Sequence, residues 1–163
     1  MEKFYKREVL FVKHETEKFL RGQTIYLALG SNMGDRKRNI DLALRKLEGI
    51  GVKIEKISSL IETDPAGGPP QGKYLNAVLR ATTELSPEKL LIKTKVIEQK
   101  LGRTPTVRNG PRPIDIDILL YDDIALSTPE LTIPHPRMRE RDFVMNPLSE
   151  IAPGVARALL CGS

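Results

Sequence analysis

The chain has 163 residues, of which 40% are hydrophobic and 29% charged, as expected for one ordinary globular domain with a sizeable core. A net charge of +5 favours anionic partners such as nucleotides or phosphates, but no run of Lys and Arg predicts a nucleic-acid tail. The single cysteine excludes an intramolecular disulfide and favours a reducing compartment. The apolar run at 9–12 is too short for a signal peptide or a membrane span, so we expect a cytoplasmic protein without a membrane partner.

The first 23 residues are predicted to form an N-terminal extension, and residues 24–163 the main domain. Residues 9–12 alone would suit a short strand, whereas a wider set of positions has helical spacing. A helical appendage packed on the domain and a disordered leader both stay open. The positions with helical spacing are Tyr5, Val9, Val12, Thr16 and Phe19.

The main domain opens with a predicted strand, turn and helix. Residues 25–29 suit a buried strand, and the turn at 30–35 leads into a helix that Asp35 or Ser31 can cap. A glycine-containing turn before a helix can bind phosphate. This turn lacks the third glycine of the dinucleotide-binding pattern, so a turn that needs glycine only for backbone geometry explains it at least as well.

Two further strands with a long loop between them are predicted next. Residues 52–63 and 74–85 suit strands, and the loop at 64–72 has the length of a functional lid. Residues 67–73 match the Gly-x-x-x-x-Gly-Lys pattern of a phosphate-binding loop. We reject that function because Tyr74 stands where a Mg²⁺-binding hydroxyl is needed, two prolines remove amide donors, and a strand follows.

A second helix has clear signals at both ends. Ser86 suits its N-cap, Pro87 its first position and Gly102 its end. Glu98 lies on its apolar side, where it forms either a salt bridge at the edge of the core or a functional group facing a site. The loop at 103–113 then carries three arginines.

The strand after this loop carries two carboxylates on one face. Asp115 and Asp117 are about 6.6 Å apart along a strand, so they repel each other unless a cation lies between them. Paired Mg²⁺ ions with phosphate oxygens suit such a pair, and Arg112 is placed to meet the phosphates. Aspartates paired with surface lysines are the alternative, but the preceding Gly-Pro-Arg and the apolar continuation favour the metal. The predicted faces are Ile114, Ile116, Ile118 and Leu120 on one side and Asp115, Asp117, Leu119 and Tyr121 on the other.

Short elements are predicted at the end of the chain. Residues 131–133 suit a strand and 145–151 a short closing element, and the tail after Pro153 is brief. His135 is held between two prolines beside several arginines, which raises a phosphate-binding function beside the structural one usual for a lone histidine. The element order β-α-β-β-α-β with extra short strands predicts the split βαβ or ferredoxin-like pattern, which is an α+β fold with a mainly antiparallel sheet.

Five motifs occur together and in order over roughly residues 24–154. They are Leu29-Gly30-Ser31-Asn32-x-Gly34-Asp35, Tyr74-Leu75-Asn76-Ala77, Leu101-Gly102-Arg103, Gly110-Pro111-Arg112-x-Ile114-Asp115-Ile116-Asp117 and Pro134-His135-Pro136-Arg137-Met138-x-Glu140-Arg141-x-Phe143. With these motifs the chain resembles the 6-hydroxymethyl-7,8-dihydropterin pyrophosphokinases of folate biosynthesis. The Gly-Pro-Arg, Asp-x-Asp and His-Pro-Arg blocks are the specific part of this resemblance. The resemblance implies an α/β sandwich on a ferredoxin-like core, which agrees with the predicted element order.

The resemblance implies an ATP-dependent enzyme that moves the β,γ-diphosphate of ATP onto the hydroxymethyl oxygen of a reduced pterin and releases AMP. ATP and the pterin are the implied small-molecule partners, two Mg²⁺ ions the cofactors, and a monomer or a weak dimer is expected. The implied catalytic residues are Arg103, Arg112, Asp115 and Asp117, and the two aspartates are the metal ligands. The implied ATP contacts are Glu98, Arg103, Arg112, Ile118, His135 and Arg141, and the implied pterin contacts are Gly30, Thr63, Asp64, Pro65, Tyr74, Asn76 and Phe143.

The ring site implied by the resemblance has a simpler alternative. Tyr74 and Phe143 would stack on the two faces of the pterin, and Asn76 offers both a donor and an acceptor to its edge. Judged from the residues alone, the two aromatic side chains suit a core and Asn76 a turn.

Three positions depart from the pattern of the family. Asn109 stands where members often have Trp, Pro105 where many have Arg, and Pro136 where some have an aromatic residue. Adenine contacts and loop closure are therefore expected to differ in this chain, and Arg108 is a candidate to replace a missing partner.

Two functions from other classes fit less well. A ferredoxin-like RNA-binding module would suit the basic charge, but it needs a strand with stacking aromatic residues, and aromatic content is only 5%. A regulatory domain that binds nucleotide without catalysis would not need both the carboxylate pair and the ring-edge residues. We therefore expect no nucleic-acid partner.

Overall fold

The computed structural model of the protein describes residues 22–162. The predicted extension at 1–23, with its helical and disordered interpretations, thus lies almost wholly outside the described residues. The described elements are β1 (Gln23–Ser31), α2 (Arg36–Gly49), β2 (Val52–Ile57), β3 (Ile61–Thr63), β4 (Tyr74–Thr83), α3 (Pro87–Lys100), β5 (Asp115–Tyr121), β6 (Leu126–Ser127), β7 (Thr132–Ile133), the 3₁₀ helix η1 (Met138–Glu140), α4 (Asp142–Ile151) and α5 (Pro153–Cys161).

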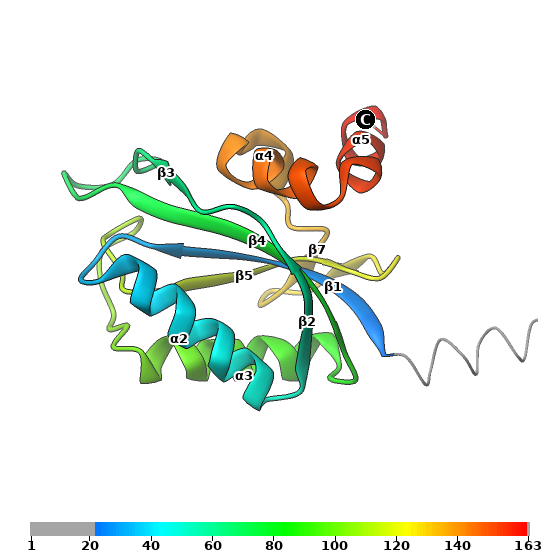
Figure 1. The fold of residues 1–163 in the computed structure, drawn as a ribbon, viewed down its shortest axis with the longest axis horizontal. Coiled ribbons are helices and arrows are strands. Elements are labelled where there is room, and N and C mark those ends of the chain that lie inside the picture. The colour runs from blue at the N-terminus through cyan, green and yellow to red at the C-terminus, as the bar shows by residue number, and fades with distance from the viewer. Residues whose placement is uncertain (1–21, 163) are drawn as a thin grey trace, which may run out of the picture.

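A twisted sheet forms the middle layer of the molecule (Figure 1). Its long strands lie in the order β2-β4-β1-β5, all neighbours are antiparallel, and β3 pairs with the first residues of β4. The short strands β6 and β7 form a separate antiparallel pair. Since α2 and α3 connect these strands on one face, the arrangement is a ferredoxin-like core, which confirms the predicted fold class.

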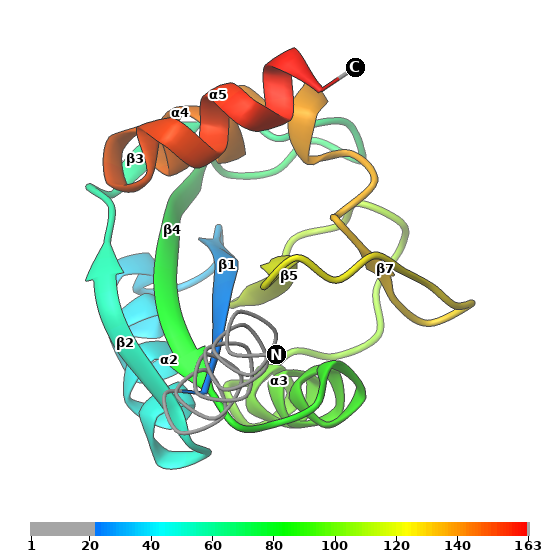
Figure 2. The ribbon, with the colours of Figure 1, turned by 90° about the vertical axis from the view of Figure 1, so that its right-hand side faces the viewer.

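Helices cover both faces of the sheet. The pair α2 and α3 lies on one face, and α4 and α5 lie on the other (Figures 1 and 2). Leu29, Ile40 and Leu90 belong to the larger core beneath α2 and α3, and Val78 and Leu148 to a smaller core beneath α4. Among the helices of residues 22–162, none is long and apolar enough to cross a membrane.

The helices α2 and α3 start where the sequence predicts. Of the two candidate caps for α2, Asp35 accepts the backbone N–H of Arg38 at 3.0 Å. Ser86 accepts the backbone N–H of Lys89 at 3.3 Å, and Pro87 occupies the first position of α3. These side chains pair N–H groups that a helix leaves without an internal partner, and this fixes the first turn of each helix.

A β-bulge in β5 corrects the predicted faces of that strand. Ile118 and Leu120 lie opposite consecutive residues of β1, so Leu119 between them is an extra residue. Up to the bulge the alternation is as predicted, but the extra residue shifts it by one position afterwards. Tyr121 therefore packs in the larger core with the isoleucines, and Leu120 packs against the smaller core. The prediction was wrong for these last two residues.

The single strand predicted at 52–63 is two strands in the structure. Strand β2 ends at Ile57. The hydroxyl oxygen of the next residue, Ser58, accepts the backbone N–H of Val78 at 2.9 Å in place of a strand carbonyl. The next backbone N–H, that of Ser59, donates to the carboxylate of Glu150 in α4 at 3.0 Å. Side chains thus replace the β ladder here, and the chain turns before β3.

The C-terminal part of the chain is more helical than predicted. The short element expected at 145–151 belongs to α4, and the tail expected after Pro153 forms α5. Pro153 stands at the first position of α5, where a missing backbone N–H costs no hydrogen bond.

Candidate active site

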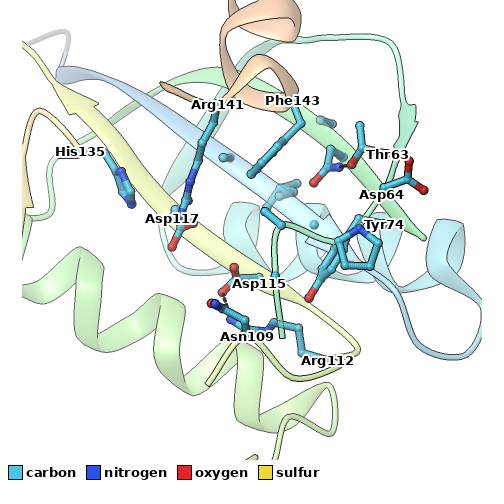
Figure 3. A pocket seen from close by; sticks show the side chains of 18 of the residues that line it. Thr63, Asp64, Tyr74, Asn109, Arg112, Asp115, Asp117, His135, Arg141 and Phe143 are labelled. Atoms are coloured by element: carbon cyan, nitrogen blue, oxygen red, sulfur yellow. Dashed lines mark hydrogen bonds and ion pairs between the residues drawn. The ribbon is translucent and has the colours of Figure 1, made fainter. Parts of the chain in front are cut away.

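A cavity of about 270 Å³ lies over the sheet on the face that carries α4 (Figure 3). Its floor consists of residues from three neighbouring strands. Gly30 of β1 lies between Asn76 of β4 and Asp115 of β5, and Ala28 lies opposite Asp117. Residues directly opposite each other share a face of the sheet, so the amide and both carboxylates point into the same space.

Gly30 keeps this floor open. A Cβ atom at position 30 would lie 3.0 Å from the Oδ1 atom of Asn76 and 3.4 Å from a ring carbon of Tyr74. The first distance is too short for an ordinary contact, so any side chain would push Asn76 away from its position. The absence of a side chain therefore allows an amide and an aromatic ring to approach the backbone of β1.

Two arginines already contact one of the carboxylates. The Nη1 atom of Arg103 lies 2.7 Å from the Oδ1 atom of Asp115, and Nη1 of Arg112 lies 3.4 Å from the same oxygen. Charge-assisted contacts of this kind hold side chains in a fixed orientation. The structure thus gathers three of the residues for which the resemblance implies catalysis.

Asp117 is in a different environment. Its side chain forms no hydrogen bond or ion pair with the other residues of 22–162. Burial, reinforced by the nearby charge of Asp115, raises the pKa of Asp117 to about 7. A partly buried carboxylate with a raised pKa binds either a proton or a cation, so this position favours a metal ligand.

Glu98 lies behind the cavity and does not line it. It is 2% exposed, it accepts the backbone N–H of Ile116 at 2.8 Å, and it lies 2.8 Å from Arg103. Burial raises the pKa of Glu98. The sequence left two alternatives for Glu98, a salt bridge at the edge of the core or a group that faces the site. In the structure Glu98 forms the salt bridge, and this contact orients Arg103. Ile118 is also buried in the core away from the cavity, and ATP contacts of both residues stay predictions.

One end of the cavity suits a flat ring with a polar edge. Tyr74 and Phe143 line it, and the amide of Asn76 donates to the hydroxyl of Thr63 at 2.5 Å. Burial raises the pKa of Tyr74, so its hydroxyl stays protonated at neutral pH. The backbone that carries Asp64, followed by Pro65, closes this end (Figure 3).

The opposite end of the cavity suits an anion. His135 and Arg141 lie there, on the other side of the carboxylates from Tyr74 (Figure 3). The Nε atom of Arg141 is buried without a hydrogen-bond partner in the described part of the chain, and its guanidinium carbon lies 5.5 Å from the centre of the Phe143 ring. A buried, unpaired donor of a cationic group is costly, so a phosphate here would gain a strong contact.

His135 is prepared to donate a hydrogen bond. Its Nδ1 atom accepts the backbone N–H of Arg137 at 3.2 Å, so the neutral ring carries its proton on Nε2. Burial, and then the charge of Arg141, lower the pKa of His135, which keeps the ring neutral at pH 7. The Nε2–H group can then donate to a phosphate oxygen.

Hydrogen bonds join the two loops that border the cavity. The side chain of Gln71 in the loop at 64–73 donates to the backbone oxygen of Asn109 in the loop at 101–114 at 2.7 Å. Asn32 donates to Gln71 at 2.8 Å and accepts the backbone N–H of Arg112 at 2.9 Å. We call these contacts the loop clasp. Glycine is required at Gly68, because a Cβ atom there would overlap the backbone oxygen of Asn109.

Several residues of the site were not predicted from the sequence. Lys95 lines the cavity and lies 3.3 Å from Glu98, one helical turn further along α3. The spacing i, i+3 from Glu98 was an available signal for it. Asn32 belongs to the first of the five motifs, but its contact with Gln71 could not be predicted, because the two residues are far apart in the sequence. Apart from Glu98 and Ile118, every site residue that was predicted from the sequence lines the cavity. These residues are Gly30, Thr63, Asp64, Pro65, Tyr74, Asn76, Arg103, Arg112, Asp115, Asp117, His135, Arg141 and Phe143.

The donor set fits a metal ion that is shared with a phosphate ligand. Within residues 22–162 there is no group of three or more His, Cys, Asp or Glu side chains that could hold a metal ion by themselves. Mg²⁺ commonly binds to only one or two carboxylates and takes its remaining ligands from water and phosphate. Asp115 and Asp117 match that requirement.

Residues 26–153 match the family model of 7,8-dihydro-6-hydroxymethylpterin-pyrophosphokinase. The chain is 49% identical over 132 residues to 2-amino-4-hydroxy-6-hydroxymethyldihydropteridine pyrophosphokinase of Aquifex aeolicus, which covers 81% of this chain and 82% of that one. It is 46% identical over 133 residues to the Bacillus subtilis protein of the same name, with 81% and 80% covered. The chain therefore belongs to the 7,8-dihydro-6-hydroxymethylpterin-pyrophosphokinase family, as the motifs predicted.

The fold of the chain also matches a solved structure. Wild-type HPPK-DHPS of Plasmodium falciparum superposes with a TM-score of 0.65 at 17% identity over 80% of this chain. The match covers 38% of that longer chain. At this level of identity the likeness shows the shared fold.

Proposed function

We propose that this protein transfers the β,γ-diphosphate of ATP to the hydroxymethyl oxygen of 6-hydroxymethyl-7,8-dihydropterin, in folate biosynthesis, and releases AMP. Membership of the family supports the reaction. The observation that supports the assignment to residues is the layout of the cavity, in which the carboxylate pair lies between His135 on one side and Tyr74 on the other (Figure 3).

The pterin is proposed to bind at the ring end. Tyr74 and Phe143 would stack on its faces, and Gly30 leaves space for the ring against β1. The amide of Asn76, oriented by Thr63, would bind the polar edge of the ring. A buried amide leaves an unpaired polar group when the wrong ring binds, so this contact would discriminate between ring systems.

The triphosphate is proposed to bind at the opposite end. The unpaired Nε of Arg141 and the Nε2–H of His135 would contact it first, because neither has another partner there. Arg103 and Arg112 would then exchange part of their contact with Asp115 for phosphate oxygens. Glu98 would keep Arg103 in place during this exchange.

The chemical step forms a bond between the hydroxymethyl oxygen and the β-phosphorus. It breaks the bond between that phosphorus and the α,β-bridging oxygen, which leaves with AMP, while the hydroxyl proton is released. Arginines around the transferred diphosphate would stabilise the charge that develops. Since the motifs contain no obvious general base, positioning of the two substrates is proposed to supply much of the acceleration.

Two Mg²⁺ ions are proposed to bind at Asp115 and Asp117 together with the triphosphate. When bound, they would polarise phosphate oxygens and offset the charge between the carboxylates. The raised pKa of Asp117 supports this proposal, because a cation at that position would release the proton that burial otherwise keeps there.

The remaining parts of the proposal concern partners and location. We propose that ATP and the pterin are the only substrates. We also propose that the chain acts as a monomer or a weak dimer in the cytoplasm, without nucleic acid or membrane. The exposed thiol of Cys161, the single cysteine, supports a reducing compartment.

Phosphorus NMR of the protein with Mg²⁺, ATP and 6-hydroxymethyl-7,8-dihydropterin tests the reaction. AMP and a pterin diphosphate are the expected products, and both should be absent when the pterin is left out. ADP with a pterin monophosphate, or ATP consumption that does not depend on the pterin, would refute the proposal.

A further inference from the structure

The ring end of the cavity has walls from two segments that are far apart in the sequence. Phe143 belongs to the first turn of α4, and Thr63, which orients Asn76, is the last residue of β3. Both segments lie beside β4, which carries Asn76 and Tyr74 (Figures 1 and 2). The space for a ring therefore depends on how α4 is held relative to β3.

Apolar packing holds α4 on the sheet. Val144, Met145 and Leu148 belong to the smaller core, and Phe143 packs against it. Hydrophobic attraction is non-directional, so it holds a helix against a sheet more strictly than it fixes the position of the helix along the sheet. A directional contact would fix that position.

Glu150 makes such a contact near the C-terminal end of α4. Its Oε1 atom accepts the backbone N–H of Ser59 at 3.0 Å and the hydroxyl of Ser59 at 2.8 Å, and its Oε2 atom lies 3.2 Å from the same backbone nitrogen. Hydrogen bonds to a charged acceptor are stronger than those between neutral groups. Ser59 lies two residues before β3, so the contact ties α4 to the connection that leads into β3, across 91 positions of the sequence.

The contact lies on the same side of α4 as Phe143. Residues seven apart are two helical turns apart and share a face, so Phe143 and Glu150 are aligned about 10.5 Å apart along the helix. On the other side of the contact, only three residues separate Ser59 from Thr63. A shift of α4 relative to Ser59 would therefore move Phe143 relative to Thr63.

We propose that Glu150 is a positioning residue for the pterin site. Its contact with Ser59 fixes α4 along the sheet, and thereby the space between Phe143 and the amide of Asn76. Glu150 does not line the cavity, so it acts through these residues and not by touching a substrate. The inference rests on the proposed function, because that function assigns the ring end to the pterin.

Steady-state kinetics of Glu150→Ala and Glu150→Gln in the full chain test the proposal. Glu150→Ala removes the whole contact, so the KM for the pterin should rise about fivefold, the effect of losing about one hydrogen bond. The KM for ATP and kcat should stay within about twofold, because only the binding of the pterin is weakened. Glu150→Gln keeps a carbonyl oxygen that can accept from Ser59, so its KM for the pterin should stay within about twofold of that of the unsubstituted protein.

A variant of the partner residue makes the test specific. Ser59→Ala removes only the hydroxyl contact, so the KM for the pterin should rise about twofold in the unsubstituted background and hardly change in Glu150→Ala. This result decides the matter should Glu150→Ala not fold. Glu130→Ala is the control, because it removes an exposed carboxylate from the turn between β6 and β7 and should change none of the constants.

The outcomes separate this proposal from the proposed function. An unchanged KM for the pterin in Glu150→Ala, or an equal rise of both KM values, would overturn the positioning role of Glu150 even though the unsubstituted protein forms AMP when the pterin is present. Lack of pterin-dependent AMP formation by the unsubstituted protein would refute the proposed function itself, and the positioning role with it.

Discussion

The two aspartates of β5 differ in what surrounds them. Asp115 is held by Arg103 and Arg112, whereas Asp117 has a raised pKa and no such partner among the described residues. The first can therefore keep the arginines in position before substrate binds. The second offers the negative charge that a cation requires. The two aspartates lie on one face of the same strand, but Asp115 is suited to position arginines and Asp117 to bind a cation.

Replacing either aspartate by asparagine should remove most of the turnover and keep the fold. Asp117→Asn is nearly isosteric and removes a charge that burial disfavours, so stability should hold or rise. Turnover at saturating Mg²⁺ should fall at least about a hundredfold, as expected when a main source of transition-state stabilisation is lost. Steady-state kinetics and circular dichroism of both variants measure the two effects.

Asp41→Asn is the matched control for these variants. Asp41 is a surface carboxylate of α2 that pairs with Lys37 at 2.8 Å, so its loss should leave turnover unchanged. Activity like that of the unsubstituted protein in Asp115→Asn or Asp117→Asn would contradict the proposed metal site.

The stability of the metal-free protein should depend on the protonation of Asp117. Its pKa is about 7 in the folded protein and about 3.9 in an unfolded chain, so between these values only the folded state binds the proton. The free energy of unfolding should therefore fall as pH rises from about 4 to about 7, by about 1–3 kcal/mol after allowance for screening.

Urea denaturation with EDTA at several pH values measures this slope. Asp117→Asn should lack that part of the slope, and Mg²⁺ with a nucleotide should stabilise the unsubstituted protein more at pH 8 than at pH 6. Identical pH profiles for the two proteins would mean that Asp117 titrates normally.

At the scale of elements, sequence and structure agree where local chemistry decides. Ser86 and Asp35 cap their helices through hydrogen bonds to residues three positions away, and such contacts can be read from the sequence. The bulge at Leu119 could not be predicted from the sequence, because Leu119 is apolar like its neighbours and would fit a regular strand equally well. The break at Ser58 depends on Val78 of another strand, and this is a tertiary contact.

In the candidate site, too, local features could be predicted from the sequence and tertiary contacts could not. The carboxylate pair follows from a period of two along one strand, so its shared orientation could be predicted. Lys95 and the loop clasp depend on how α3 and two loops pack against β5. Pro153 did carry a signal for the start of α5, which the brevity of the tail obscured.

The loop clasp should couple the binding of the two substrates. We expect the pterin to bind well only after the Mg²⁺-nucleotide, because phosphate contacts of Arg103 and Arg112 order the loop that Gln71 joins to its neighbour. Gln71→Ala removes one hydrogen bond, so pterin affinity in the nucleotide complex should fall about 2–10-fold.

Calorimetry with a non-hydrolysable ATP analogue measures this coupling. Gln99→Ala, at an exposed position of α3, is the control and should bind the pterin normally. Equal pterin affinity with and without the analogue in the unsubstituted protein would argue against the coupling.

At the scale of the whole molecule, the sheet separates two surfaces. The cavity lies on the face with α4, and a groove lined by cations lies between α2 and α3 on the opposite face. Among residues 22–162, those that line the cavity fall within 28–143. We therefore expect the N-terminal segment to be dispensable for chemistry.

Removal of residues 1–21 should leave turnover within about twofold of the full chain, a change of less than about 0.4 kcal/mol in the activation barrier. The shortened chain should stay folded, because the described strands, helices and both cores lie within residues 22–162. Kinetics and thermal denaturation of the shortened chain measure these effects. A large loss of turnover in a folded protein would mean that the segment forms part of the active site.

The loop clasp consists of hydrogen bonds from amide groups, and no charged side-chain atom takes part in it. Ionic strength should therefore affect the binding of ATP strongly and the binding of the pterin only weakly. Salt screens the attraction between arginines and phosphates, so the KM for ATP should rise between low and high salt. The affinity for the uncharged pterin, measured with nucleotide already bound, should hardly change. A titration with potassium chloride thus separates capture of the nucleotide from closure of the loops.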